Sequence, residues 1–374
     1  MKKSRITIIE NHHIASGTIR ADLMNALVNE GYDVYVLTEL DKSFDPAINT
    51  NIHFVNVGVS VLNPVAALKY MYRLRKALKQ IKPTLCITFT IRPAIYGNIV
   101  ASLLKIPVIS TITGTGPLFD SKSLSYRIAR NLYKVVLKKT KRVFFPNYDD
   151  LNGFVERGYI KKEVAVRVPG SGINYEKFLP RASSRTDNNF IFLFISRLVK
   201  DKGILEFAEA ASMITKTNKQ AEFHVIGPLW LNNKKSLTVT KEEVDKWVSE
   251  KWIVYHGEQK DIRKFMADAD CVVMPSYREG MSNVLLEAAS MARPLIATDV
   301  TGCRDIVENG KNGFLCRPKD GKDLAGCMQK MLRLTNEQRI EMGKYGREKM
   351  IREFDKKIVV QKYLQAIEEV INGK

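Results

Sequence analysis

The chain has 374 residues, of which 45% are hydrophobic and 26% charged. Because a single core rarely grows beyond about 250–300 residues, we expect two domains. This composition excludes a disordered chain, and no apolar run approaches the roughly 20 residues of a membrane span. The N-terminal apolar stretch is too short for a secretory signal, so we expect an intracellular protein. The five Cys residues include no Cys-x-x-Cys pair, which argues against a disulfide framework or a thiolate zinc site.

The net charge is +19, and it is unevenly distributed along the sequence. Residues 1–180 carry 26 basic and 13 acidic side chains, whereas the remaining residues carry 33 and 27. Such an excess favours a polyanionic partner, which can be nucleic acid, an anionic membrane face or a phosphorylated substrate.

Short β-branched apolar runs alternate with helical patterns along the whole chain. The predicted strands of the first half are 5–10, 33–38, 52–57, 84–89, 108–113, 142–146 and 164–168. Those of the second half are 190–196, 221–227, 252–257, 271–275, 294–297 and 313–316. Buried strands separated by helices are typical of parallel sheets covered on both faces. We therefore predict an α/β protein with two Rossmann-like parallel-sheet domains facing across a cleft.

A linker is predicted at 171–189, within a stretch rich in Pro, Gly, Ser and Asn that has no apolar period. This gives an N-terminal domain at 1–170 and a C-terminal domain at 190–350. A last helix is predicted at 351–374, and we expect it to return to the N-terminal domain. Since ligands of parallel α/β sheets bind at the carboxyl ends of the strands, we expect the site there.

The most informative local pattern lies at 271–288. A buried strand is followed by a glycine loop and a helix that Ser282 or Asn283 can cap. The free N–H groups of such a helix form a seat for a diphosphate. Glu279 in the loop and Glu287 in the helix are suited to accept hydrogen bonds from sugar hydroxyls. On spacing alone, a solvated loop residue and a favourable first-turn charge are equally consistent with these two carboxylates.

A second pattern, at 196–203, follows the first strand of the second domain. It places Arg197 and Lys202 in the turn before a helix, where phosphate-binding loops lie. The planar Arg fork and the mobile Lys charge can together neutralise a diphosphate leaving group. Without the preceding pattern, a charged surface turn would be the simpler interpretation.

The Arg-x4-Lys-Gly spacing of Arg197 and Lys202 and the Glu-x7-Glu spacing of Glu279 and Glu287 together resemble the donor site of retaining glycosyltransferase family 4. The similarity is to bacterial members that build lipid-linked oligosaccharides and surface polysaccharides. Further similarities are found at 270–276, 293–297, Gly302 and 312–315. The resemblance covers essentially the whole chain, is specific only in the second half, and implies the GT-B fold.

The resemblance also implies roles for individual residues. Arg197 and Lys202 would bind the donor diphosphate, and Glu287 would hold the ribose hydroxyls. Glu279 would address the sugar hydroxyls and the distal phosphate, and it is expected to act in catalysis together with Arg197 and Lys202. The backbone of the following loop would contribute as well, at Gly280, Met281, Ser282 and Asn283. No metal and no other cofactor are implied beyond the nucleotide sugar, which is a co-substrate.

The nucleotide base would lie against the loops after Gly227 and at 255–257, with uridine as the expected base. In the first half, the family's glycine-rich loop is represented by Gly17 alone, which we expect to bind the donor. Many members carry a His after the strand that ends near residue 112, beside the reacting sugar, but this chain has Thr113. The loop there is expected to approach the sugar or the acceptor, and its residues are Thr113, Gly114, Thr115 and Gly116. It lacks the third Gly of a dinucleotide fingerprint, so NAD binding is not expected.

Two patterns that invite a metal are interpreted without one. His12 and His13 are adjacent, and adjacent side chains of an extended segment point to opposite faces, so we interpret them as polar loop residues. Asp268 and Asp270 form the DxD triplet of metal-dependent glycosyltransferases. They lie where a helix enters a buried strand, which favours a capping or turn role.

Two basic stretches without acidic residues, 63–83 and 121–142, carry apolar side chains at helical spacing. Basic amphipathic helices suit an anionic membrane surface and the diphosphate of a lipid-linked acceptor. Ordinary Rossmann helices with solvated basic faces are the alternative. We favour peripheral association with the inner face of the cytoplasmic membrane, because the charge is one-sided and lies in the presumed acceptor domain.

The leading hypothesis is a metal-independent glycosyltransferase that moves a hexose or N-acetylhexosamine from a UDP-sugar to a growing glycan. We expect this glycan to be carried on a polyprenyl diphosphate lipid, in cell-surface polysaccharide or glycoconjugate biosynthesis. A GT-B-type nucleotide-sugar epimerase would share the architecture but would leave the basic helices unexplained. A nucleic-acid-binding protein is disfavoured, since no recognition-helix, RNP or zinc-finger pattern is present.

Overall fold

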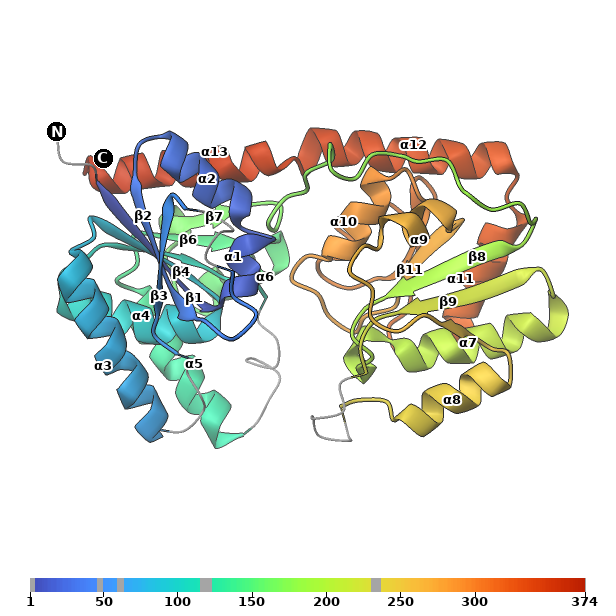
Figure 1. Ribbon diagram of the computed structural model, residues 1–374, viewed down its shortest axis with the longest axis horizontal. Coiled ribbons are helices and arrows are strands. Elements are labelled where there is room, and N and C mark those ends of the chain that lie inside the picture. The colour runs from blue at the N-terminus through green and yellow to red at the C-terminus, as the bar shows by residue number, and fades with distance from the viewer. Residues whose placement is uncertain (1–3, 46–49, 59–63, 115–122, 230–236, 374) are drawn as a thin grey trace. The chain divides into compact units, whose positions relative to one another are not determined.

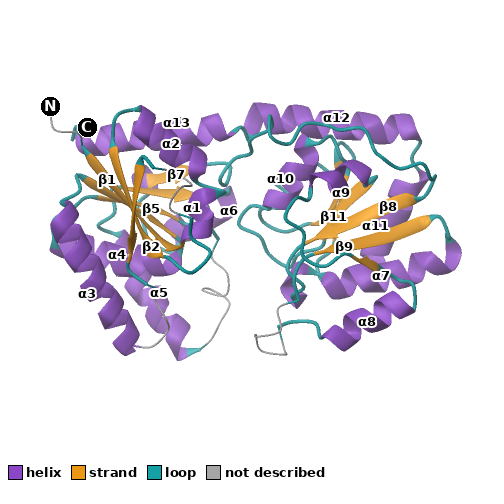
Figure 2. Ribbon diagram, viewed as in Figure 1, coloured by secondary structure: helices purple, strands orange, loops and turns teal. Residues whose placement is uncertain are grey.

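The computed structural model describes residues 4–45, 50–58, 64–114, 123–229 and 237–373. The chain divides into two compact units (Figure 1). The N-terminal unit comprises Met1–Gly172 and Lys356–Lys374, and the C-terminal unit comprises Ile173–Asp355. Each unit has its own parallel sheet surrounded by helices, as Figure 2 shows.

The N-terminal unit contains a seven-stranded parallel sheet in the order β3-β2-β1-β4-β5-β6-β7. Its strands are β1 (Arg5–His12), β2 (Asp33–Glu39), β3 (Ile52–Asn56), β4 (Leu85–Phe89), β5 (Val108–Thr111), β6 (Arg142–Phe145) and β7 (Ala165–Arg167). Its helices are α1 (His13–Gly17), α2 (Ala21–Asn29), α3 (Pro64–Ile81), α4 (Ile91–Leu103), α5 (Leu124–Leu137), α6 (Tyr148–Glu156) and α13 (Lys356–Ile371).

The two faces of this sheet are covered by different helices. Ile6 and Ile8 of β1 pack with side chains of α2 and α13, whereas Ile9 packs with side chains of α3 and α4. Neighbouring side chains of a strand point to opposite faces, so a strand covered on both sides must be apolar throughout. On α13, the Tyr363 ring stacks on Phe144 at 4.2 Å between ring centroids. The last helix of the chain is therefore part of the N-terminal core.

The C-terminal unit contains a six-stranded parallel sheet in the order β10-β9-β8-β11-β12-β13. Its strands are β8 (Phe190–Ile195), β9 (Ala221–Ile226), β10 (Val254–Tyr255), β11 (Cys271–Met274), β12 (Leu295–Thr298) and β13 (Gly313–Cys316). Its helices are α7 (Ile204–Thr217), α8 (Lys241–Ser249), α9 (Arg263–Asp268), α10 (Asn283–Ser290), α11 (Gly321–Arg333) and α12 (Asn336–Glu353).

Strand β8 shows how this sequence produces a central strand. Its phenylalanines, at 190, 192 and 194, belong to one hydrophobic cluster, and its aliphatic residues, at 191, 193 and 195, belong to another. All six side chains are buried. Burying a large apolar side chain contributes about 1.5–3 kcal/mol, so both faces of this strand stabilise the unit.

The thirteen predicted strands are all present, with ends that differ by at most two residues, and the predicted α/β class with two parallel sheets is confirmed. Residues 173–189, most of the predicted linker, belong to the C-terminal unit. Asp268 accepts hydrogen bonds from the Ser184 backbone N–H at 2.8 Å and the Ser183 hydroxyl at 3.0 Å. Asp270 binds Arg185 at 3.0 Å. The two aspartates thus anchor this segment, in addition to the predicted capping or turn role.

None of the helices in the described ranges is long and apolar enough to span a membrane. The five cysteines form no disulfide and are buried. Burial raises the pKa of the Cys86 thiol, which keeps it protonated.

Candidate active site

A cavity of about 360 Å³ lies at the carboxyl ends of strands β8, β9 and β11 in the C-terminal unit. Parallel strands direct their carboxyl ends to the same edge, so the loops that follow them meet there. Most of the predicted donor-site residues contribute to its wall. Those that line it are Arg197, Lys202, Gly227, Glu279, Met281, Ser282 and Asn283.

The first wall is the loop that joins β8 to α7. After Arg197 the chain forms a short 3-10 turn, Lys200–Lys202, and then passes through Gly203 with φ of +75°. A Cβ atom at Gly203 would lie 2.0 Å from the Pro275 carbonyl oxygen, so only glycine allows this loop to pack against the end of β11. That close approach brings Lys202 to the same edge as the β11 loop.

The second wall is the loop from β11 to α10. Ser282 caps α10, and its hydroxyl accepts a hydrogen bond from the Leu285 N–H at 3.4 Å. Asn283 and Val284, at the start of the helix, line the cavity, so the first N–H groups of α10 lie at its edge, where they favour an anion. Gly302, with φ of +78°, supports this loop from behind, since a Cβ atom there would lie 2.7 Å from the carbonyl oxygens of Glu279 and Gly280.

Lys202 and Glu279 form an ion pair at the pocket wall. Lys202 Nζ lies 2.6 Å from Glu279 Oε1, which also accepts a 2.8 Å hydrogen bond from the Ser276 hydroxyl. The side chains of Lys202 and Glu279 are 22% and 11% exposed, and Ser276 is fully buried. Charge-assisted hydrogen bonds of this length are about twice as strong as neutral ones, and partial burial strengthens them further. The ammonium group is therefore held in position by the protein itself.

Tyr277 ties the two loops together beneath this pair. Its hydroxyl donates to Glu206 Oε1 at 2.7 Å, and its backbone N–H donates to the Asp201 carbonyl oxygen at 2.8 Å. Burial, together with the neighbouring Glu206 carboxylate, raises the pKa of Tyr277 well above its usual range. The phenol therefore stays protonated and acts as a fixed donor that supports the loop carrying Lys202.

The third wall follows β9 and β10. Gly227 has φ of +143°, and a Cβ atom there would lie 1.8 Å from the Ser196 carbonyl oxygen. Its N–H donates to the Gly257 carbonyl oxygen at 2.8 Å, and its own carbonyl oxygen accepts from the Tyr255 hydroxyl at 2.8 Å. The predicted base-binding loops at 227 and 255–257 are thus hydrogen-bonded to each other.

Among the other residues that line the cavity, sequence reasoning missed four in the loops that follow β9 and β10. They are Pro228, Glu258, Gln259 and Ile262. The Gln259 side-chain amide donates to the His256 carbonyl oxygen at 2.7 Å, which fixes its orientation. They could have been found from their position in the loops that follow β9 and β10, because any loop at the carboxyl edge of this sheet can reach the cavity.

The remaining predicted residues lie elsewhere. Gly280 belongs to the β11 loop and Glu287 to α10, but neither is among the described residues that line the cavity. Gly17 ends α1 in the N-terminal unit. Thr113, which is exposed, and Gly114, with φ of +128°, follow β5 in that same unit. Thr115 and Gly116 lie outside the described residues.

The N-terminal unit has a strained residue at the carboxyl edge of its own sheet. Thr90, directly after β4, has φ of +71° and ψ of +167°, a conformation that is almost confined to glycine. Its hydroxyl accepts a hydrogen bond from the Asn11 amide at 2.9 Å, and its N–H donates to the Thr111 carbonyl oxygen at 3.2 Å. Backbone strain held by such contacts is typical of ligand-binding edges.

Comparison with known proteins assigns the chain to a class. Residues 189–334 match the family model described as glycosyl transferases group 1, and residues 11–147 match the model described as glycosyl transferase 4-like. The two segments together span most of both units.

Several characterised bacterial proteins are similar over nearly their whole length. N,N'-diacetylbacillosaminyl-diphospho-undecaprenol alpha-1,3-N-acetylgalactosaminyltransferase of Campylobacter jejuni is 24% identical, with 95% of this chain and 96% of the relative covered. UDP-Gal:alpha-D-GlcNAc-diphosphoundecaprenol alpha-1,3-galactosyltransferase of Escherichia coli is 25% identical, with 94% of each chain covered. The capsular polysaccharide biosynthesis glycosyltransferase CapM of Staphylococcus aureus is 24% identical, with 89% of each chain covered.

Solved structures share the architecture. Sucrose-phosphate synthase from Thermosynechococcus elongatus superposes with a TM-score of 0.83 at 17% identity, with 100% of both chains covered. HepE from Anabaena, in complex with UDP and glucose, superposes with a TM-score of 0.78 at 17% identity, with 98% of this chain and 100% of that chain covered. The fold is therefore GT-B. Because glycosyltransferase models match both halves, the chain belongs to the group 1 and family 4-like glycosyltransferases and is an enzyme of that class, as its spacing patterns predict.

Proposed function

We propose that this glycosyltransferase moves a hexose or N-acetylhexosamine from a UDP-sugar to a growing glycan on a polyprenyl diphosphate lipid, with retention of anomeric configuration. The product would enter cell-surface polysaccharide or glycoconjugate biosynthesis. The observation that carries this proposal is the convergence of Lys202, Glu279 and the N-terminus of α10 on one cavity.

The charges of the cavity suit the departure of a nucleoside diphosphate. As the bond to the sugar breaks, negative charge develops on the leaving phosphate oxygens, and preorganised cations and N–H groups stabilise it. Lys202 and Arg197 supply the cations and the first turn of α10 supplies the N–H groups. Glu279, held by Ser276, is placed to accept hydrogen bonds from sugar hydroxyls. The proposal includes transfer without Mg²⁺ or Mn²⁺, because Lys202 and Arg197 can supply the positive charge that such an ion would provide.

The proposed acceptor is supported by the relatives. Two of them are named for sugars linked to undecaprenyl diphosphate, and a third is named for capsular polysaccharide biosynthesis. The base and the donor class are supported by the UDP-galactose donor in the name of the E. coli relative and by the UDP complex of HepE. These relatives transfer sugars, which favours transfer over the epimerase alternative.

Two helices of the N-terminal unit support a peripheral location on the cytoplasmic membrane. On α3, Val65, Leu68 and Tyr72 are each 67% exposed and lie at i, i+3 and i+7, so they form one outward stripe. On α5, the apolar residues at 124, 128, 132 and 135 form a similar stripe and are 38–61% exposed. Exposed lysines and arginines flank both stripes, and both helices pack against α4 (Figure 1). Apolar stripes bordered by basic residues are typical of helices that lie on an anionic membrane.

The proposal is tested by incubating purified protein with a panel of nucleotide sugars and a membrane extract. Transfer of one sugar into butanol-soluble lipid, with release of free UDP and without added divalent ions, is expected. Lys202→Ala should lower the rate of this transfer by about 10²–10³-fold, whereas Lys200→Ala, in the same turn but outside the cavity lining, should leave it intact. Equal rates in both variants, or a rearranged nucleotide sugar formed without acceptor, would contradict the proposal.

A further inference from the structure

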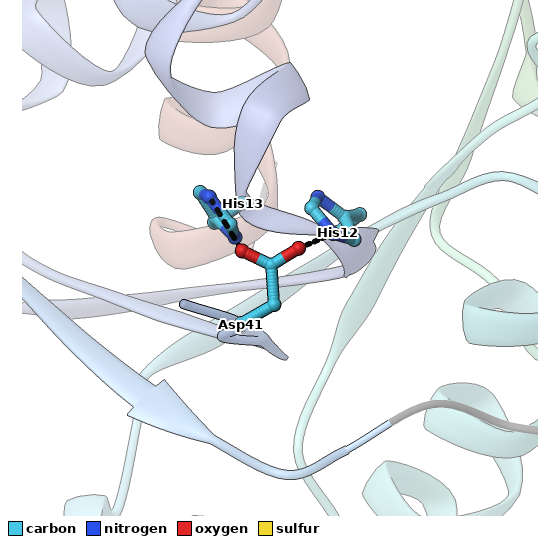
Figure 3. Close-up of side chains that lie close together, drawn as sticks. All are labelled: His12, His13 and Asp41. Atoms are coloured by element: carbon cyan, nitrogen blue, oxygen red, sulfur yellow. Dashed lines mark hydrogen bonds and ion pairs between the residues drawn. The ribbon is translucent and has the colours of Figure 1, made fainter. Parts of the chain in front are cut away.

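Three side chains with metal-ligating atoms converge at the carboxyl edge of the N-terminal sheet (Figure 3). His12 Nε2 lies 3.0 Å from Asp41 Oδ2, and His13 Nε2 lies 3.8 Å from Asp41 Oδ1. One ligand atom from each residue falls within 4.8 Å of the others. None of these residues belongs to the donor cavity.

The convergence follows from where the helix begins. The sequence predicts that adjacent histidines point to opposite faces, which holds only if the strand continues through both. In the structure β1 ends at His12 and α1 begins at His13, with a register irregularity between Ile9 and His12. The two imidazole rings therefore stack at 4.4 Å between centroids, and both face Asp41, which lies just after the neighbouring strand β2. The predicted opposite orientation is wrong for this reason.

The protein holds two of the three ligands in the form that a metal requires. His13 Nδ1 lies 3.2 Å from the Glu39 carbonyl oxygen, which can only accept, so Nδ1 carries a proton. This leaves Nε2, which lies 3.3 Å from the Ser43 hydroxyl and 3.8 Å from Asp41 Oδ1, as the nitrogen that can bind an ion. Asp41 Oδ1 accepts hydrogen bonds from the Ser43 N–H at 2.8 Å and from the Ser43 hydroxyl at 2.6 Å. These hydrogen bonds fix the orientation of the Asp41 carboxylate. Partners of this kind orient the ligands in metal sites.

We propose that His12, His13 and Asp41 form a binding site for one divalent transition-metal ion of the zinc class. Two imidazole nitrogens and one carboxylate oxygen match the ligand preference of Zn²⁺ and its neighbours rather than that of Mg²⁺ or Ca²⁺. Ligand atoms about 2.0–2.2 Å from a tetrahedral ion lie roughly 3.2–3.6 Å apart. The observed distances from the Asp41 oxygens to His12 Nε2 and His13 Nε2, 3.0 and 3.8 Å, lie on either side of this range. Three protein ligands leave one coordination position open for a water or substrate oxygen.

His12 must change its tautomer when the ion binds. Its Nδ1 accepts a hydrogen bond from the Ile14 N–H at 3.3 Å, so the proton sits on Nε2 and points to Asp41. On binding, the ion takes the Nε2 lone pair and the proton moves to Nδ1, at the expense of the contact with Ile14. That contact is long, so its loss is small compared with a metal–nitrogen bond. His12 and Asp41 are 33% and 47% exposed, which gives the ion a path from solvent, while the buried His13 supplies the fixed ligand.

The proposal is tested on the full-length protein after dialysis against a chelator. Titration with Zn²⁺ by calorimetry should show one equivalent bound per chain, and Co²⁺ should give the visible absorption bands of a tetrahedral nitrogen–oxygen site. Asp41→Asn and His13→Gln should each weaken Zn²⁺ binding by at least about tenfold. The matched control is His53→Gln. His53 lies in the same unit and also pairs with an aspartate, Asp33, at 3.1 Å, but that pair includes no second histidine. This variant should bind Zn²⁺ like the wild type.

Absence of saturable binding to the wild-type protein would overturn the proposal, as would unchanged binding by Asp41→Asn. Circular dichroism checks that each variant is folded, and Asp41→Asn serves if His13→Gln is not, because Asp41 is a half-exposed loop residue. Binding is measured without donor or acceptor. The outcome is therefore independent of the transferase proposal, whose test uses the donor cavity of the other unit.

Discussion

Lys202 and Glu279 are 77 positions apart in the sequence, and their side chains meet at 2.6 Å in the wall of a single cavity. The contact joins the turn after β8 to the loop after β11, the two segments whose spacing resembles the donor site of family 4 glycosyltransferases. In the proposed function, the Glu279 carboxylate that binds a sugar hydroxyl also orients the Lys202 ammonium that binds the donor phosphate.

Lys202→Ala should lower the rate of transfer by about 10²–10³-fold, because removal of one preorganised group from a charge-stabilising site has effects of this size. Glu279→Gln keeps the shape of the side chain but loses its charge, so Lys202 becomes mobile and the rate should also fall. Steady-state kinetics with the identified donor measures both effects. Thermal unfolding of each variant checks that the fold is retained, and a rate near that of the wild type in both would exclude the pair from catalysis.

Gly227→Ala should destabilise the C-terminal unit by about 3 kcal/mol, because the new methyl group would lie 1.8 Å from the Ser196 carbonyl oxygen and the backbone must shift. Gly326→Ala is the matched control, since it lies inside α11 with open space around its Cα. It should stabilise by about 0.5–1 kcal/mol through helix propensity alone. Urea unfolding compares them, and an equal effect of the two substitutions would contradict the steric argument.

Glu308 should make stability depend on acidic pH. Its carboxylate binds the buried Lys349 at 2.9 Å, and it also accepts from Lys311 and from the Tyr345 hydroxyl. The hydrogen bond from Lys349 is the main reason why the pKa of Glu308 is lowered to about 2. Because this pKa is lower in the folded than in the unfolded protein, ionised Glu308 stabilises the folded state fully above the unfolded-state pKa of about 4.5. This stabilisation is lost as the pH falls from 4.5 toward 2.

Glu308→Gln should therefore be about 2 kcal/mol less stable than the wild type at pH 7, a typical effect for charged hydrogen bonds, and the difference should shrink below pH 4.5. Urea unfolding at pH 7, 4 and 3 measures it. Glu341→Gln serves as control, because Glu341 is exposed and lies 4.0 Å from Lys344 on the same helix as Lys349. A difference that stays constant with pH would show that Glu308 does not act through its charge.

Replacing apolar side chains of the α3 and α5 stripes should release the protein from membranes. The double variant Leu68→Glu and Ile128→Glu places charge where we propose that acyl chains are contacted, so sedimentation with vesicles rich in anionic lipid should fall at least about tenfold. Ile340→Glu is the control, since Ile340 is similarly exposed but lies on α12 of the C-terminal unit. Equal binding by both variants would remove the stripes from the proposed membrane contact.

The sequence alone predicted the two-sheet α/β architecture, the order of the strands along the chain and the family. These features depend on local patterns, because a strand buried on both faces must be apolar throughout, as 190–195 is, and a turn that approaches another backbone closely must contain glycine, as at Gly203 and Gly227. Such patterns can be recognised in consecutive residues without knowledge of the tertiary structure.

Tertiary structure alone decided which distant side chains meet. The ion pair of Lys202 with Glu279, the anchoring of residues 183–185 by Asp268 and Asp270, and the presence of Gln259 in the cavity depend on which loops share an edge of the sheet. Local irregularity mattered as well, since the start of α1 at His13 turns both histidines toward Asp41. Periodicity fixes which residues are buried, but the directions of polar side chains are set by hydrogen bonds to partners that are remote in sequence. The fold could therefore be predicted from the sequence, whereas the polar contacts at the carboxyl edges of the two sheets required the tertiary structure.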